Sequence, residues 1–307
     1  IVELIGGSEG PAKKLVFAAL KNKKHVVTAN KALISKYGDQ LAKIAENNKV
    51  NLEFEAAVCG GVPIIRSIKE GLIANKISRI YGIFNGTSNY VLSSMDNNQT
   101  SFNDTIKKAI KLGYAESNPS SDINGDDVAS KVKILSCLSF NSYINKDIHV
   151  EGIKNIDEED IINANKLGYK IKLMGFSEIS NNKIFQRVHP TLVKNTSYIA
   201  SVDGVLNAVV IDGKPIGINT IQGDGAGPSA TTSALVSDIS SILRGNIKYP
   251  FAISSNKRKN YPSGKITDLF FSSYIRLNVK DKYGVLSDVT KIFSNNKVSI
   301  KRVLQSP

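Results

Sequence analysis

Residues 1–28, IVELIGGSEGPAKKLVFAALKNKKHVVT, decide the fold class. They show a short apolar strand (Val2–Ile5), a glycine turn, an amphipathic helix (Pro11–Lys21) and a second strand (His25–Thr28). Pro11 suits the first turn of a helix, where its missing N–H leaves no hydrogen bond unmade. Strands that alternate with helices in this way predict a parallel sheet and therefore an α/β domain.

The alternation continues along the chain with a predicted helix over residues 33–47 and a predicted strand over Val50–Ala57. The first strand of such a unit, with any G-x-G-x-x-G turn after it, would lie upstream of residue 1. We therefore expect the chain to begin within a domain, and the prediction of a cofactor has to rest on other residues.

The composition is that of a globular protein. The 307 residues are enough for two or three domains with a sizeable core. Hydrophobic residues make up 41% and charged residues 22%, which excludes a disordered chain. No apolar run approaches the roughly 18 residues that span a bilayer, and the first residues lack the basic segment of a signal peptide. We therefore expect no membrane association.

The reactive and charged side chains exclude several further classes. Cys59 and Cys137 have neither disulfide nor metal-ligand spacing, so we expect small buried side chains and a cytoplasmic protein. The histidines are too far apart in sequence for a transition-metal motif. The net charge of +13 comes from lysines spread along the whole chain, with the densest run, Lys257-Arg258-Lys259, in a polar stretch. This distribution does not predict a nucleic-acid partner.

The stretch GYAESNPSSDINGDDVASK (113–131) gathers charges of both signs at the start of a predicted helix. Asn124-Gly125 forms a turn just before a helical period of apolar residues. Asp127 and Lys131, four residues apart, share one face of that helix. On spacing alone, the pattern favours an exposed ion pair beside a solvated acidic loop.

Three further stretches leave a structural and a functional interpretation open. HVVTANKAL (25–33) puts Lys31 after a parallel strand, where a cofactor or substrate contact and a plain surface lysine are equally supported. FEAAVCGGVPII (54–65) could turn carbonyls toward a hard cation, although a simple strand-to-helix turn is favoured. GDGAGPSATTSALVSDI (223–239) sets glycines at a helix N-terminus that can face an anion, or forms only a tight turn.

Together with GIFNGTSNYVLSSM (82–95), these four stretches resemble the homoserine dehydrogenase family in order and spacing. The fifth stretch looks like that family's G-I-x-N-G-T-x-N-Y signature. The likeness is to the monofunctional bacterial form with a C-terminal ACT domain, without the first part of its nucleotide-binding domain and the end of its ACT domain. It implies an NAD- or NADP-dependent oxidoreductase that interconverts L-aspartate 4-semialdehyde and L-homoserine, in threonine, methionine and isoleucine biosynthesis.

The resemblance also implies the organisation of the chain. Residues 1–50 would be the C-terminal part of a Rossmann-like NAD(P)-binding domain, to which residues 223–246 return. Residues 51–222 would form an α+β catalytic and dimerisation domain. A linker over 254–268 would lead to a truncated ACT (βαβ) segment over 269–307.

The resemblance assigns roles to individual residues as well. Lys131 would be the catalytic proton donor to the aldehyde oxygen, and Lys31 would act close to the nicotinamide. The substrate-binding residues would be Gly113, Glu116, Asp122 and Asp127. The cofactor contacts would come from Lys31, Gly223, Gly225 and Gly227. A sodium ion would be held by backbone atoms of Glu55, Val58, Gly60 and Val62. One departure from the family's A-E-x-D-P pattern is Asn118, a position that we expect to be structural.

The tail is similar to the first half of an ACT domain, with a predicted strand, helix and strand between residues 273 and 305. Such modules often bind amino acids, and threonine would be the natural effector. A tail that only stabilises a dimer is an equally supported interpretation. We expect a homodimer or homotetramer.

Two other functions compete with the dehydrogenase. A non-catalytic regulatory protein that binds an amino acid would not need both Lys31 and Lys131. Another nicotinamide-dependent oxidoreductase of a small amino-acid carbonyl compound would need a different loop between Gly113 and Lys131.

The substrate's ammonium group needs an anionic partner, for which Glu116 is the candidate. We expect Glu116→Gln to raise the KM for homoserine more than it lowers kcat, because it removes the charge and keeps the side-chain shape. Steady-state kinetics measure both constants. A fall in kcat with an unchanged KM would assign Glu116 to another task.

Overall fold

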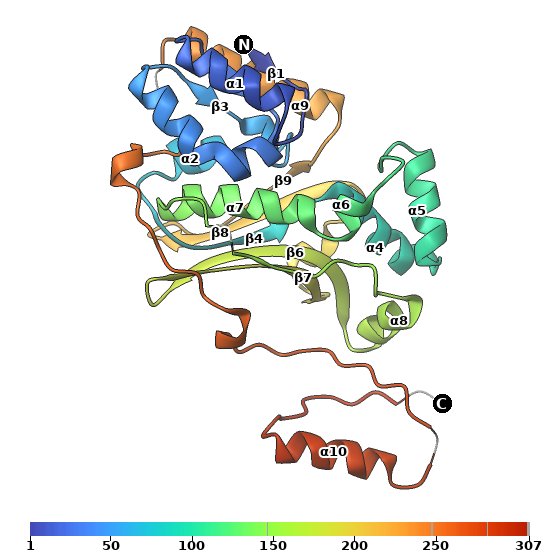
Figure 1. Ribbon diagram of the computed structural model, residues 1–307. Helices are drawn as coiled ribbons and strands as arrows, with labels where there is room; N and C mark the ends of the chain where they lie inside the picture. Colours follow the sequence, from blue (N-terminus) through green and yellow to red (C-terminus); the bar gives the residue numbers. More distant parts are fainter. Residues whose placement is uncertain (146, 247, 281, 306–307) are drawn as a thin grey trace.

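The computed structural model describes residues 1–145, 147–246, 248–280 and 282–305 (Figure 1). Its first unit is a three-stranded parallel sheet with the strand order β1 (Val2–Glu3), β2 (Val26–Thr28) and β3 (Leu52–Glu53). The connecting helices are α1 (Pro11–Lys21) and α2 (Lys31–Asn47). The predicted parallel α/β unit is confirmed, with α1 at the predicted bounds.

The second unit is a six-stranded sheet with the order β5-β7-β6-β4-β8-β9. All neighbours are antiparallel except β5 and β7. Its strands are β4 (Lys76–Ile83), β5 (His149–Val150), β6 (Tyr169–Ser180), β7 (Lys183–Lys194), β8 (Leu206–Lys214) and β9 (Gly217–Asp224). A polar turn at Asn181 and Asn182 joins β6 to β7, with both residues at positive φ.

Helices complete the second unit. They are η1 (Glu55–Ala57), α3 (Ile64–Arg66), η2 (Ser67–Gly71), α4 (Gly86–Asn98), α5 (Phe102–Lys111), α6 (Ser120–Ile123), α7 (Asp126–Phe140), α8 (Glu158–Lys166) and η3 (Tyr198–Ser201). The helix that follows β9, α9 (Pro228–Leu243), packs back against β2 and η1. In the described part of the chain, no helix has the length and apolarity to cross a membrane.

Helix α7 lies between the two units (Figure 1). It packs on β4 and β6 of the larger sheet and on α2 of the first unit. Twelve of its residues are buried, because two faces of the helix are covered. The main hydrophobic core therefore runs through both units, while a second apolar cluster around Ile83, Met174 and Val210 lies away from it.

The strand predicted over Val50–Ala57 is shorter in the structure and ends at Glu53. The cause is the buried carboxylate of Glu55, which accepts the backbone N–H groups of Ile65 and Arg66 at 2.9 and 2.7 Å. These bonds satisfy the carboxylate only if the chain leaves the strand, and η1 makes that turn.

Residues 254–268, the polar stretch that we expected to be a linker, pack against the two units. It contains η4 (Ser255–Lys257) and η5 (Ile266–Asp268). Arg258 is buried, with its guanidinium paired to Asp39 at 2.6 Å and stacked over the rings of Tyr143 and Phe251. The densest basic run of the sequence therefore places its arginine inside the protein.

The tail confirms the predicted helix, as α10 (Val285–Asn295), but the flanking strands are not formed in its described residues. Residues 281 and 306–307 lie outside the description. A strand needs a hydrogen-bonded neighbour, and neither flanking segment finds one. The segment before α10 is instead attached by Arg276, which pairs with Asp157, Glu159 and Asp160 at the start of α8.

Gly175 lies in β6, where side chains of the main hydrophobic core pack closely against it. A Cβ there would lie 2.5 Å from Val132 Cγ2 and 2.8 Å from Phe84 Cδ2. We expect Gly175→Ala to lower the free energy of unfolding by about 1–3 kcal/mol, measured by chemical denaturation. The control is Gly71→Ala, because a Cβ added there meets nothing within 4 Å. This variant should change the free energy of unfolding by less than about 1 kcal/mol. Equal values for the two variants would contradict the close packing.

Candidate active site

The site is built around the carboxylate of Asp127, which is 5% exposed in the first turn of α7. One oxygen lies 2.9 Å from Lys31 Nζ and the other lies 2.8 Å from Lys131 Nζ. The preference for an exposed ion pair, drawn from spacing alone, is therefore wrong. The pair is buried because α7 is covered by both units.

The two lysines reach Asp127 from different places. Lys31 begins α2, directly after the N-cap Asn30, and its side chain is 40% exposed. Lys131 lies one turn after Asp127 on α7, is 9% exposed, and donates a second hydrogen bond to the carbonyl oxygen of Phe84 at 2.6 Å. One lysine thus comes from the first unit and one from the helix that joins the units.

Charge pairing governs the ionisation of this group. Burial alone would raise the pKa of Asp127, but Lys131 and Lys31 outweigh it and hold that pKa below its usual range. Burial alone would lower the pKa of Lys131, but Asp127 outweighs it and the pKa is raised. The result is a buried ammonium group that stays protonated at neutral pH.

Asn85 ties a second carboxylate to the first. Its side-chain amide donates to Asp122 at 2.7 Å and to Asp127 at 2.9 Å. Its oxygen accepts the N–H of Ser88 and caps α4. Burial, and then the charge of Asp127, raise the pKa of Asp122. Asn85 lies in the GIFNGTSNY stretch, but nothing in the sequence assigned it a role.

The loop before α6 carries the other predicted substrate residues. Gly113 takes a positive φ of 74° just after α5, where the chain reverses. Glu116 is exposed and makes no ion pair or side-chain hydrogen bond with the described residues. Asn118 accepts the N–H of Ser120 at 3.2 Å, in agreement with a structural position. The structure thus joins Asp122, Asp127 and both lysines, but leaves Glu116 outside their contacts.

A cleft of about 550 Å³ opens beside Lys31. Its lining comes from the end of β1, the end of β2 and the start of α9: Leu4, Gly6, Ala29, Asn30, Gly227, Pro228, Thr231, Thr232 and Leu235. Helix N-termini and strand carboxyl ends are the usual binding places for dinucleotide phosphates in α/β sheets. The volume and the lining therefore fit part of a nicotinamide dinucleotide.

The three glycines of the predicted cofactor turn are placed differently. Gly227 caps α9 at a positive φ of 109° and lines the cleft. Gly223 is inside β9. Gly225 packs on the buried Asn207, whose side chain would lie 2.2 Å from an added Cβ. Asn207 in turn donates to the sulfur of Cys59 at 3.2 Å, so this end of the turn supports the neighbouring loop.

The predicted sodium loop has an irregular path. The backbone carbonyls of Glu55 and Val62 each accept one backbone N–H, from Val58 and Ile64. The carbonyls of Val58 and Gly60 accept none from the described residues. Hard cations are bound by such oxygens, so this loop can supply part of a sodium shell. The described residues contain no cluster of His, Cys, Asp and Glu suited to a metal ion.

The buried carboxylate should stabilise the fold. We expect Asp127→Asn to lower the free energy of unfolding at pH 7 by about 3–5 kcal/mol, because it leaves Lys131 buried without its counter-ion. The depressed pKa of Asp127 makes this contribution present above the unfolded pKa of about 3.9 and lost as the pH falls through the folded value.

Urea unfolding at pH 7 and at pH 3 measures both effects, and the difference from the unsubstituted protein should shrink at pH 3. Asp126→Asn is the matched control, because the neighbouring carboxylate is exposed and unpaired among the described residues. If the two variants are equally stable at pH 7, the ion pair does not stabilise the fold.

Comparisons with known proteins agree with this geometry. A model of the homoserine dehydrogenase NAD-binding domain matches residues 1–55, and a homoserine dehydrogenase model matches residues 63–240. The homoserine dehydrogenase of Neisseria gonorrhoeae is 40% identical over 99% of this chain and 72% of its own length.

Solved structures lead to the same family. A homoserine dehydrogenase from Thiobacillus denitrificans superimposes with a TM-score of 0.91 at 39% identity, over 99% of this chain and 72% of that one. A hyperthermophilic archaeal homoserine dehydrogenase in complex with NADPH superimposes with a TM-score of 0.70 at 29% identity, over 80% of this chain and 72% of that one. A non-catalytic regulatory protein and a different nicotinamide enzyme are thereby set aside. The chain belongs to the homoserine dehydrogenase family of nicotinamide-dependent oxidoreductases.

Proposed function

We propose that Lys131 is the general acid of the homoserine dehydrogenase reaction, in which L-aspartate 4-semialdehyde is reduced to L-homoserine. The observation that carries the proposal is the buried ion pair of Lys131 and Asp127. Lys31 connects this pair to the cleft, since it binds Asp127 and directly follows the cleft residues Ala29 and Asn30.

The chemistry requires a proton donor at the aldehyde oxygen. The reduced nicotinamide, when bound, supplies the hydride to the aldehyde carbon. Negative charge then develops on the oxygen, where the ammonium of Lys131 stabilises it and gives up a proton. Asp127 raises the pKa of Lys131 and so keeps it protonated, and the ion pair between them orients it. In the oxidation direction Lys131 must first lose this proton, so oxidation runs faster at alkaline pH.

The remaining charged residues would bind the substrate. Glu116 would bind the substrate ammonium. This role is supported by the exposure of its carboxylate, which forms no ion pair with the described residues. Asp122 would orient the substrate from its bond to Asn85. Gly113 would line it, at the bend where the loop begins.

The finer details of the bound groups are also proposals. NAD or NADP would lie in the cleft, with Lys31 and Gly227 nearest to it and Gly223 and Gly225 supporting the turn. Sodium would be held by carbonyls of the 55–62 loop, where two of the four oxygens accept no backbone bond from described residues. Its part would be structural.

We place the enzyme in the cytoplasm as a homodimer or homotetramer in threonine, methionine and isoleucine biosynthesis. The location is supported by the two buried free cysteines. Support for the assembly is a stack of Tyr81, Phe176 and His189 beside the second apolar cluster.

Threonine would act at the tail, which we assign to an ACT domain because α10 presents unpacked apolar side chains such as Leu286 and Ile292. Turnover with and without threonine, in the enzyme and in a truncation after Asp268, tests that role.

Removing the proton donor should stop turnover. We expect Lys131→Ala to lower kcat by about 10²–10⁴-fold and to leave the dissociation constant of the cofactor nearly unchanged. Steady-state assays and cofactor titration measure the two quantities. The control is Lys133→Ala on the same helix, which makes no ion pair with the described residues. A drop below about threefold for Lys131→Ala would disprove the assignment.

A further inference from the structure

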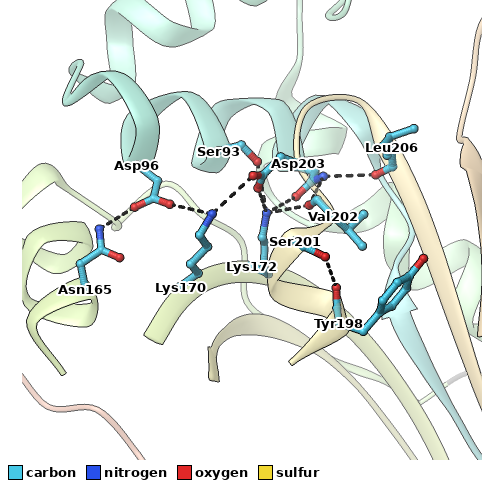
Figure 2. Close-up of polar contacts among 11 residues, drawn as sticks. Ser93, Asp96, Asn165, Lys170, Lys172, Tyr198, Ser201, Val202, Asp203 and Leu206 are labelled. Atoms are coloured by element: carbon cyan, nitrogen blue, oxygen red, sulfur yellow. Dashed lines mark hydrogen bonds and ion pairs between the residues drawn. The ribbon is translucent and has the colours of Figure 1, made fainter. Parts of the chain in front are cut away.

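Another buried lysine, Lys172, lies outside the site, on β6 (Figure 2). The side chain of Lys172 is only 1% exposed. Its ammonium donates to the carbonyl oxygen of Val202 at 2.7 Å and to the carboxylate of Asp203 at 2.7 Å. It also reaches Asn89 Oδ1 and Ser93 Oγ, both at 3.2 Å. All the hydrogen-bonding capacity of the ammonium is therefore used inside the protein.

The neighbouring Lys170 shows that the strand does not require this burial. It lies on the same face of β6, is 23% exposed, and pairs with Asp96 and Asp203 near solvent (Figure 2). Burial lowers the pKa of Lys172 even though Asp203 opposes the shift. An apolar side chain would fill this position without that desolvation cost. The bonds of Lys172 therefore select one arrangement of the groups around it.

Those groups belong to α4. Asn89 and Ser93 are one turn apart on this helix, so one ammonium holds two successive turns. Asn89 also donates to the carbonyl oxygens of Val202 and Leu206, at 3.0 and 3.2 Å. The helix is thereby fixed both to β6 and to the segment that enters β8.

The held turn is next to the active site. Asn85, the N-cap of α4, lies one helical turn before Asn89, about 6 Å along the axis. Asn85 binds both Asp122 and Asp127, and the preceding Phe84 carbonyl accepts from Lys131. A rotation or slide of α4 would therefore move these partners relative to α7.

We propose that Lys172 is a positioning residue for the reaction: it holds α4 so that Asn85 aligns Asp127 and the chain before the helix aligns Lys131. Lys172 itself touches none of the proposed reacting groups and acts through the helix. The inference rests on the proposed roles of Asp127 and Lys131.

The test is Lys172→Met in the intact enzyme, which keeps the length of the side chain and removes the ammonium. A small misplacement of reacting groups is costly, so we expect kcat to fall by about 10–100-fold. The KM for the nicotinamide cofactor should stay within about twofold, because α4 contributes nothing to the cleft lining. A purely structural role would lower thermal stability without separating kcat from that KM.

Lys170→Met is the matched control, because it removes an ion pair with the same Asp203 from the same strand face. We expect it to change kcat by less than about twofold. Asp203→Asn provides a second variant at the more exposed end of the network, and it should lower kcat in the same direction by less. It decides the question if Lys172→Met does not fold.

The outcomes separate this inference from the proposed function. If Lys131→Ala loses turnover while Lys172→Met and Asp203→Asn keep the kcat of the unsubstituted enzyme, the positioning role is overturned and the proposed function stands. If Lys131→Ala keeps its kcat, the proposed function fails, and the positioning role fails with it.

Discussion

One buried carboxylate, that of Asp127, forms ion pairs with two ammonium groups, one from the unit with the parallel sheet and one from the helix between the units. A buried ammonium without a counter-ion is strongly unfavourable, so the buried Lys131 depends on Asp127, whereas Lys31 reaches the same carboxylate from a partly exposed position. Lys31 belongs to the unit with the parallel sheet, and Lys131 to the helix between the units. The candidate active site therefore lies where the first unit meets α7, and the contact to which we assign the chemistry also joins Lys31 of that unit to α7.

Neighbouring elements shield the ion pairs of Asp127 from water and hold the paired groups in place. Helix α7 is covered on one side by the larger sheet and on the other by α2, which removes water from around Asp127. Asn85 and the Phe84 carbonyl complete the bonds that the charged groups still need. Lys172 fixes the helix that begins at Asn85. The candidate active site is therefore built from polar contacts that lie within the main hydrophobic core.

The sequence predicted what is local. The bounds of α1 follow from Pro11 and the apolar period, and the shared face of Asp127 and Lys131 follows from their spacing. Burial of that pair could not be predicted, because Lys31 and Asn85 reach it from far along the chain.

The other errors have the same kind of cause. The strand from Val50 was drawn too long because the partners of Glu55 lie ten residues on. The predicted strands of the tail depend on neighbouring strands that the local sequence pattern does not contain. The attachment of the tail differs in kind from the contacts at the centre. Arg276 holds it to α8 through carboxylates of which two, on Asp157 and Glu159, are exposed. Dissolved salt screens such exposed pairs over about 8 Å at physiological ionic strength, whereas buried pairs are screened much less. Ionic strength should therefore weaken the attachment of the tail more than it weakens the buried pair of Asp127 and Lys131.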